Sequence, residues 1–318
     1  MTAPVERSAE CGGGFAIWLI REVALRCGRP FTRLFLYPIC LYFFFRRAPE
    51  RRTSRAFLTR VFGRPASARQ VLRHIHCFAS TILDRTFLLA GRHDLFDIRV
   101  AGADAIAAAM QDGRGALLVG AHVGSFEILR ALGARQPGLA VRAVLDTTRT
   151  PNLSRLLHAL NPGAAGEIID AARPAAEVAL AIDEGVSAGA LVALLADRAR
   201  AGEATLDAAF LGAPAHFPVA PYLVASALQV PIVLAFGIYR GGNRYDVHFE
   251  RFPAVPPLPR PRHAGDLQPF VDRFASCLEQ HVRHAPYNWF NFDDFWNPSP
   301  GPVAAVRVGI GGEPRCAA

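Results

Sequence analysis

Residues 115–127 read GALLVGAHVGSFE, and this stretch decides the fold expected for the chain. Its first part, Gly115–Ala121, is a short apolar run bounded by glycine, which is typical of a buried strand. The residues Val123–Ser125 suit a tight turn that ends in a helix cap. The stretch therefore predicts a strand, a turn and a helix, and it places His122 at the carboxyl end of the strand.

The same alternation of apolar runs and helical patterns continues from about residue 98 to residue 252. Further strands are expected at residues 139–146, 167–170, 190–196, 231–239 and 244–252. Helices are expected at residues 103–111, 125–135, 151–160, 174–184 and 218–228, and a later one near 266–284. This order predicts an α/β fold with a mixed, largely parallel sheet flanked by helices. Chemistry in such sheets is found at the carboxyl ends of strands.

The net charge of +8 is concentrated at the start of the chain. Residues 1–75 hold 14 Arg and 4 Glu, a balance of +10, so the remainder is close to neutral. The same region contains LFLYPICLYFFF (Leu34–Phe45), which is shorter than the roughly 20 apolar residues that span a bilayer. An apolar segment beside arginines predicts an N-terminal membrane-associating helical segment on an anionic surface. The alternative is a buried helix pair with a solvated basic face.

These patterns divide the chain into three parts. We expect residues 1–75 to form the membrane-anchoring segment, residues 76–297 the α/β domain, and residues 298–318 a disordered tail rich in Gly, Pro and Ala. No nucleic-acid-binding motif accompanies the arginines, so we expect no nucleic-acid partner. The six cysteines form no CxxC pair, which indicates reduced thiols rather than a metal or redox motif.

All 35 basic side chains are arginine. The absence of lysine excludes a Schiff-base lysine, a pyridoxal-phosphate anchor and a P-loop lysine. A proton-transferring group must therefore be sought elsewhere, and His122 is the candidate. Glu127 lies in the first turn of the next helix, where its carboxylate can orient the imidazole and stabilise the imidazolium. The alternative is a buried, satisfied histidine and a glutamate that is favoured at a helix start.

The pattern His122–x4–Glu127, in the form HVGSFE after an apolar strand, resembles the HX4(D/E) motif of the glycerolipid and lysophospholipid acyltransferases. The similarity runs through most of the chain and is greatest to the branch of late acyltransferases of lipid A biosynthesis. It implies that His122 is the general base on an acceptor hydroxyl and Glu127 its partner. It also implies an acyl carrier protein or coenzyme A thioester as donor, a membrane glycolipid or lysolipid as acceptor, and no cofactor or metal. The implied location is the cytoplasmic face of a bacterial inner membrane.

Two further blocks supply candidate substrate-binding residues. In DTTRTPNLSRLL (Asp146–Leu157), either Arg149 or Arg155 can bind a phosphate, or either can be a solvated helix charge. Asp197 and Arg198 directly follow an apolar strand, which is an expected ligand position. Backbone N–H groups of the 124–126 turn are the expected oxyanion donors.

Later segments carry weaker signals. FLGAPAHFPVAP (Phe210–Pro221) resembles the loop that leads to a later proline in the acyltransferase family, and His216 and Phe217 either line an acyl tunnel or pack. PYNWFNFDDFW (Pro286–Trp296) resembles the C-terminal segment of the acyltransferase branch, and we expect a lid near the lipid entrance. The G-x-S-x-G match at 185–189 follows a helix and precedes a strand, the reverse of a hydrolase elbow.

Histidine pairs at 74/76 and 281/284 lack companion metal ligands in the sequence. Two other functions remain open beside acyl transfer. A thioesterase or lipid hydrolase would use water in place of a lipid hydroxyl, and a non-catalytic protein would bind lipid on the same fold.

Overall fold

The computed structural model describes residues 22, 26–134, 139–148, 160, 168–200, 202–259 and 263–296. Its main sheet contains the strands β1 (Asp97–Ala101), β2 (Leu117–Gly120), β3 (Val141–Leu145), β4 (Ile168–Asp170), β5 (Leu191–Leu195), β8 (Ile232–Gly241) and β9 (Arg244–Arg251). Within the described residues their order is β1-β9-β8-β2-β5-β3-β4. Neighbours are parallel except β8 and β9, which are antiparallel. The prediction of a mixed, largely parallel sheet is confirmed.

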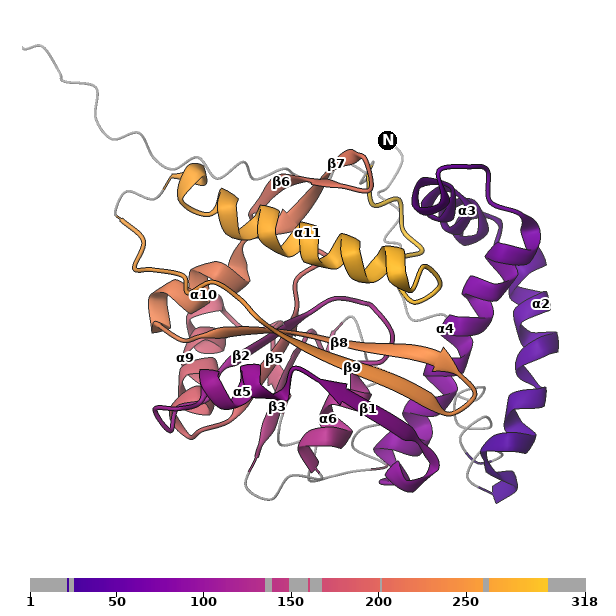
Figure 1. Ribbon diagram of the computed structural model, residues 1–318, viewed down its shortest axis with the longest axis horizontal. Helices are drawn as coiled ribbons and strands as arrows, with labels where there is room; N and C mark the ends of the chain where they lie inside the picture. The colour runs from indigo at the N-terminus through magenta and orange to yellow at the C-terminus, as the bar shows by residue number, and fades with distance from the viewer. Residues whose placement is uncertain are drawn as a thin grey trace, which may run out of the picture.

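Helices cover both faces of this sheet (Figure 1). They include α5 (Ala103–Ala109), α6 (Glu127–Ala134), α9 (Ala175–Ser187), α10 (Ala220–Leu228) and α11 (Gln268–His284). Alternate residues of β2 enter different cores, because successive strand side chains point to opposite faces. Leu117 and Val119 pack in the core that contains residues of α9, α10 and α11, whereas Leu118 packs in the core with residues of α5 and α6. A strand buried on both faces reads as the continuous apolar run seen in the sequence.

The register between β2 and β5 positions the site. Gly120, the last residue of β2, is opposite Leu195, the last residue of β5. The N–H of Ala196 donates to the carbonyl of Gly120 at 2.9 Å. The chain segments that leave the two strands therefore start side by side, although some 75 residues separate them in sequence.

In the described part of the chain, the helices α2 (Leu36–Arg46), α3 (Ala48–Phe62) and α4 (Ala68–Leu89) precede the sheet, and residues 26–34 before α2 are also helical. A capping box formed by Ser67 and Gln70 starts α4. This helix runs without a break across residue 75, where a domain boundary was expected, and packs with the sheet through Leu83 and Phe87. Figure 1 shows α2 and α3 at one side of the molecule, with α4 next to them. No described helix is both long and apolar enough to cross a membrane.

The segment expected as a loop at residues 210–221 is instead largely structured. It contributes to an antiparallel hairpin of β6 (Thr205–Phe210) and β7 (Ala213–Pro218). Buried and exposed side chains alternate along both strands, as expected for a hairpin with one face against the core. Phe210 and Phe217 are fully buried in the core that also contains residues of α11. Strand β1 was also not expected, and its mostly exposed residues explain the absence of an apolar run. Two 3-10 turns, η1 (His93–Leu95) and η2 (Ala264–Asp266), are also present.

Candidate functional site

His122 lies two residues beyond the end of β2, on a tight turn that leads into α6. The turn requires glycine at position 124, where φ is +67°. A Cβ atom on Gly124 would lie only 1.9 Å from the carbonyl oxygen of Gly237 in β8. The close approach of these two backbones holds the turn against the sheet, and with it the backbone of His122.

Asp197 is the carboxylate that holds His122. One carboxylate oxygen is 2.8 Å from Nδ1 of the imidazole, and the other accepts the backbone N–H of His122 at 3.1 Å. The second oxygen also accepts the indole N–H of Trp289 at 3.0 Å. The Asp197 side chain is fully buried, while 37% of the His122 side chain is exposed. A buried anion thus fixes the orientation of a histidine that reaches solvent.

Burial alone would raise the pKa of Asp197. The attraction of His122 and its hydrogen bond outweigh that cost, with help from Arg198 and Trp289, and keep the pKa well below its ordinary value. Asp197 is therefore an acceptor of the Nδ1 proton, which leaves Nε2 as the nitrogen able to take a proton. Within the described part of the chain, Nε2 has no hydrogen-bond partner.

The pairing expected between His122 and Glu127 is corrected by this geometry. Glu127 lies in the first turn of α6, where its buried carboxylate is 2.8 Å from the guanidinium of Arg85 on α4. The helix turns the carboxylate toward α4, whereas Asp197 emerges from the strand beside β2. Asp197 was expected only as a substrate ligand, because its proximity to His122 depends on strand order rather than on spacing in the sequence.

The expected oxyanion donors are also corrected in part. The N–H of Gly124 donates to the carbonyl of Asn288, and the N–H of Ser125 donates to the carbonyl of Gly237, both at 2.8 Å. These two amides are used in holding the turn to its neighbours. They cannot serve a substrate oxygen while those bonds persist.

The first half of the segment expected as a lid, residues 288–291, lies in the interior, whereas Asp293 and Asp294 are exposed. Asn288 and Trp289 are buried, and the backbone N–H of Phe290 donates to the carbonyl of His122 at 2.8 Å. The side-chain amide of Asn288 binds both backbone groups of Tyr239 in β8. The segment is thus a strap that ties the His122 turn to the sheet. Its aromatic density was visible in the sequence, but the indole bond to Asp197 was not.

Arg198 faces the same strap. One guanidinium nitrogen donates to the carbonyl of Phe290 at 2.5 Å, and the other is 3.6 Å from Asp293. Its Nε atom is buried without a hydrogen-bond partner among the described residues. The structure therefore brings Asp197 and Arg198 to the His122 site. Arg149 and Arg155 lie outside the described residues, as do residues 151–159 of the helix expected at 151–160 and the tail at 298–318.

His74 packs behind the strap and is fully buried. Its two ring nitrogens are bonded to the hydroxyl of Ser54 and to the carbonyl of Trp289, at 2.8 and 2.9 Å. Burial lowers the pKa of His74 to about 4, against a small opposing effect of the Trp289 carbonyl, so the ring is neutral at pH 7. His74 is therefore a structural residue of the strap.

The remaining histidine candidates have ordinary partners. His281 bonds to Glu250 at 2.6 Å, and His284 contacts a carbonyl of its own helix. His216 is an exposed partner of Asp207, while Phe217 packs in the core.

Across the described residues, no three His, Cys, Asp or Glu side chains are grouped as metal ligands would be. The G-x-S-x-G match lies at the end of α9 and before β5, which is the order expected for a chance match.

The chain matches the model of a known protein family. The family described as bacterial lipid A biosynthesis acyltransferase matches residues 15–297, which covers most of the chain and all of the site described above. No curated protein matches the chain.

Proposed function

The chain belongs to the family of bacterial lipid A biosynthesis acyltransferases, and from this premise we propose that it moves a fatty acyl group from a thioester to a lipid hydroxyl. The donor is an acyl carrier protein or coenzyme A thioester. The acceptor is a glycolipid or lysolipid. The observation that carries the proposal is a half-exposed histidine at a strand end whose Nδ1 is held by a buried carboxylate.

In the proposed reaction, Nε2 of His122 takes the proton of the acceptor hydroxyl as its oxygen attacks the acyl carbonyl. A carbon–oxygen bond forms, the carbon–sulfur bond breaks, and the proton passes from His122 to the leaving thiolate. Asp197 stabilises the imidazolium that exists between the two transfers, as the carboxylate does in a Ser-His-Asp triad. The chemistry as proposed uses no metal or redox cofactor.

Arg198 is the proposed anion-binding group of the site, with Arg149 and Arg155 as further candidates. A guanidinium that is partly satisfied by a backbone carbonyl keeps donors for a substrate phosphate or for the acyl carbonyl oxygen. Glu127 supports the site indirectly, because its ion pair with Arg85 ties α6 to α4 below the turn.

A direct test compares acyl transfer by the full chain and by His122→Ala in detergent, with labelled acyl thioester as donor. We expect product ester only when lipid acceptor is present, and a loss of at least about 10³-fold in the variant. Transfer at the parental rate by His122→Ala would reject the proposal. Release of free fatty acid at the same rate with and without acceptor would instead identify a thioesterase.

We further propose that the protein works on the cytoplasmic face of the bacterial inner membrane, attached through α2. Seven of the ten large apolar side chains that are exposed among the described residues lie between residues 31 and 45. They are Phe31, Leu34, Phe35, Tyr37, Leu41, Tyr42 and Phe45. Such a contiguous apolar surface beside arginines fits an interfacial helix on an anionic leaflet.

Vesicle flotation tests this attachment. The double variant Leu41→Glu/Phe45→Glu places two charges on the apolar side of α2 and should release most of the protein from anionic vesicles. The matched control Val100→Glu/Leu180→Glu replaces two exposed apolar residues on β1 and α9 and should float as the parent does. Equal flotation of both variants would place the attachment elsewhere.

A further inference from the structure

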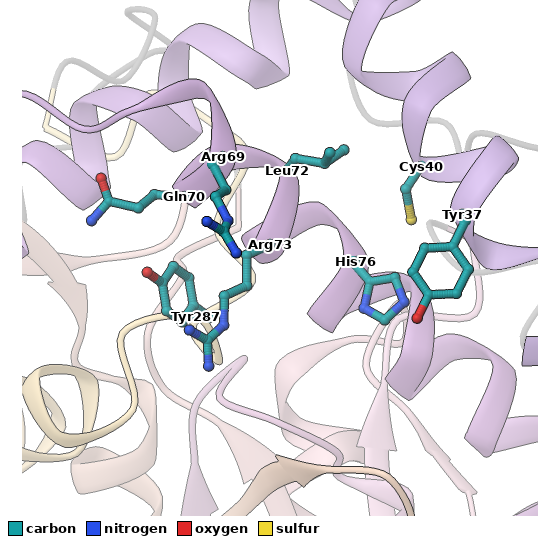
Figure 2. A pocket seen from close by; sticks show the side chains of 8 residues that line it. All are labelled: Tyr37, Cys40, Arg69, Gln70, Leu72, Arg73, His76 and Tyr287. Carbon is teal, nitrogen blue, oxygen red and sulfur yellow. The ribbon is translucent and has the colours of Figure 1, made fainter.

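A cavity of about 560 Å³ lies between α2 and α4, away from the residues assigned to acyl transfer. Figure 2 shows the eight side chains around it. They are Tyr37 and Cys40 of α2, Arg69, Gln70, Leu72, Arg73 and His76 of α4, and Tyr287 of the strap. The cavity combines a cationic side with an apolar and aromatic side, and neither side has a role in the reaction proposed above.

The cationic side consists of Arg69 and Arg73. The two arginines are one turn apart on α4, a spacing at which like charges repel and destabilise a helix. No acidic residue lines the cavity, and no described acidic side chain forms an ion pair with either arginine. The Arg73 guanidinium lies over the Tyr287 ring, 4.5 Å from its centre, which holds the charge in place. Both arginines are exposed, and two neighbouring guanidinium groups without a protein anion, one of them held by an aromatic ring, form a site that suits a phosphate.

The other side of the cavity continues onto the exposed surface of α2. The rings of Tyr37 and His76 are 5.2 Å apart and close the cavity between the two helices (Figure 2). Tyr37 itself belongs to the exposed apolar surface of α2, together with Leu41 on the next turn, and the exposed Leu34 lies just before the helix. A ligand with its anion at the arginines would therefore extend its remainder along an apolar helix surface.

The positive charge near His76 would favour the binding of an anionic ligand. Burial and the nearby Arg33 both lower the pKa of His76, so the ring is neutral at pH 7 and can donate one hydrogen bond. Arg33 donates to the Tyr239 hydroxyl through one nitrogen, while another is buried without a hydrogen-bond partner among the described residues. The groups that face the cavity are thus cationic or neutral.

We propose that this cavity binds the phosphate headgroup of an anionic membrane phospholipid, with Arg69 and Arg73 as the phosphate ligands and the acyl chains along α2. This lipid is neither donor nor acceptor in the acyl transfer. Binding would convert a diffuse attraction to an anionic leaflet into a stoichiometric contact. Because Tyr287 belongs to the strap, two residues before the Trp289 that donates to Asp197, the bound lipid would also set the height of the catalytic site above the membrane surface.

This inference depends on the proposed function in one respect only: the membrane to which the protein attaches supplies the phospholipid. Lipid binding is measured without any acyl thioester, so its failure is distinguishable from a failure of acyl transfer. A protein that binds phospholipid but transfers no acyl group would reject only the proposed reaction.

The test uses the full chain in a neutral detergent at about 0.15 M salt, where nonspecific surface attraction is largely screened. Short-chain phosphatidylglycerol is titrated and binding is followed by calorimetry or Trp fluorescence. The variant Arg69→Gln/Arg73→Gln should bind at least about tenfold more weakly than the parent. The control Arg52→Gln/Arg55→Gln removes the same charge from exposed positions of α3 outside the cavity and should bind within about twofold of the parent.

Equal weakening by both double variants would overturn the inference, because the arginines would then act only through net charge. Two ligand controls complete the test. Short-chain phosphatidylcholine should bind weakly, and glycerol phosphate should not compete at concentrations near those of the lipid. Competition by glycerol phosphate as strong as by the lipid would assign the cavity to a soluble phosphate compound and overturn the lipid proposal. Far-ultraviolet circular dichroism should show parental helix content in both double variants.

Discussion

Asp197 accepts two hydrogen bonds from one residue, His122: the ring Nδ1–H at 2.8 Å and the backbone N–H at 3.1 Å. The carboxylate therefore fixes both the side chain and the main chain of the proposed base. A carboxylate that is fully buried and kept ionised by its partners is costly to maintain, which suits a catalytic role better than a structural one.

The first prediction concerns Asp197→Asn. The amide keeps the size of the side chain but can present its NH2 group to Nδ1, which favours the wrong tautomer of the ring. We expect kcat to fall by about 10³-fold with little change in KM for the acceptor. Steady-state kinetics with purified protein measure this. A variant that keeps more than a tenth of parental kcat would contradict the role assigned to Asp197.

The second prediction concerns the ion pair of Arg85 and Glu127. It tests whether Glu127 only stabilises the fold or takes part in the reaction. Arg85→Met leaves the buried Glu127 carboxylate unpaired and should lower the free energy of unfolding by about 3 kcal/mol. Adding Glu127→Met to that variant should restore most of the loss, and chemical denaturation measures both. Kinetics of the folded double variant then decide the role of Glu127. A fall in kcat as large as that of Asp197→Asn would restore Glu127 as a direct partner of the reaction.

Trp289→Phe tests the strap. The substitution keeps an aromatic ring in the core but removes the N–H that donates to Asp197 at 3.0 Å. A hydrogen bond to a charged group contributes about 2 kcal/mol, so we expect a loss of stability of that size and a fall in kcat of about tenfold. Phe295→Leu, which alters the aromatic packing around Trp289 without touching Asp197, is the control. It should lower stability but leave kcat within about threefold of the parent.

Gly124→Ala tests the backbone contact beneath His122. The added Cβ would lie 1.9 Å from the carbonyl oxygen of Gly237, so the turn must move. We expect a loss of more than about 3 kcal/mol in stability and of most activity. Gly63→Ala is the matched control, because Gly63 has a similar φ of +64° with no atom near the new Cβ. Its cost should be about 1 kcal/mol, and similar costs for both variants would contradict the steric argument.

His74 predicts a pH dependence of stability. Its pKa is about 4 in the folded chain and about 6.5 when unfolded, so the unfolded state binds more protons between these values. Stability should therefore fall with acidification, by about 2 kcal/mol between pH 7.5 and pH 5 from this residue. His74→Phe removes that contribution, and denaturation at the two pH values gives it by difference from the parent. Equal pH dependence in the two proteins would show that His74 is not held neutral.

Much of the fold could be predicted from the sequence, because apolar runs and helix periodicity report local burial directly. The stretch at 115–127 predicted the strand that ends before His122, the turn and the helix, and all three are present. The hairpin at 205–218 and strand β1 were missed, since half-exposed strands carry no continuous apolar run. The segment Pro286–Trp296 was recognised as distinctive, but the burial of residues 288–291 was not expected.

The sequence by itself singled out His122 as the candidate for proton transfer, because the chain has no lysine and this histidine follows a buried strand. It also showed that positive charge and an apolar, aromatic-rich run gather before residue 75, whereas the exposure of those aromatic residues came from the structure. Only the tertiary structure decided which carboxylate serves the histidine. Spacing along the chain favoured Glu127, five residues away, but hydrogen bonding between β2 and β5 brings Asp197 to the ring while α6 turns Glu127 toward Arg85. Strand order is set by the packing of the whole sheet, and no local pattern encodes it.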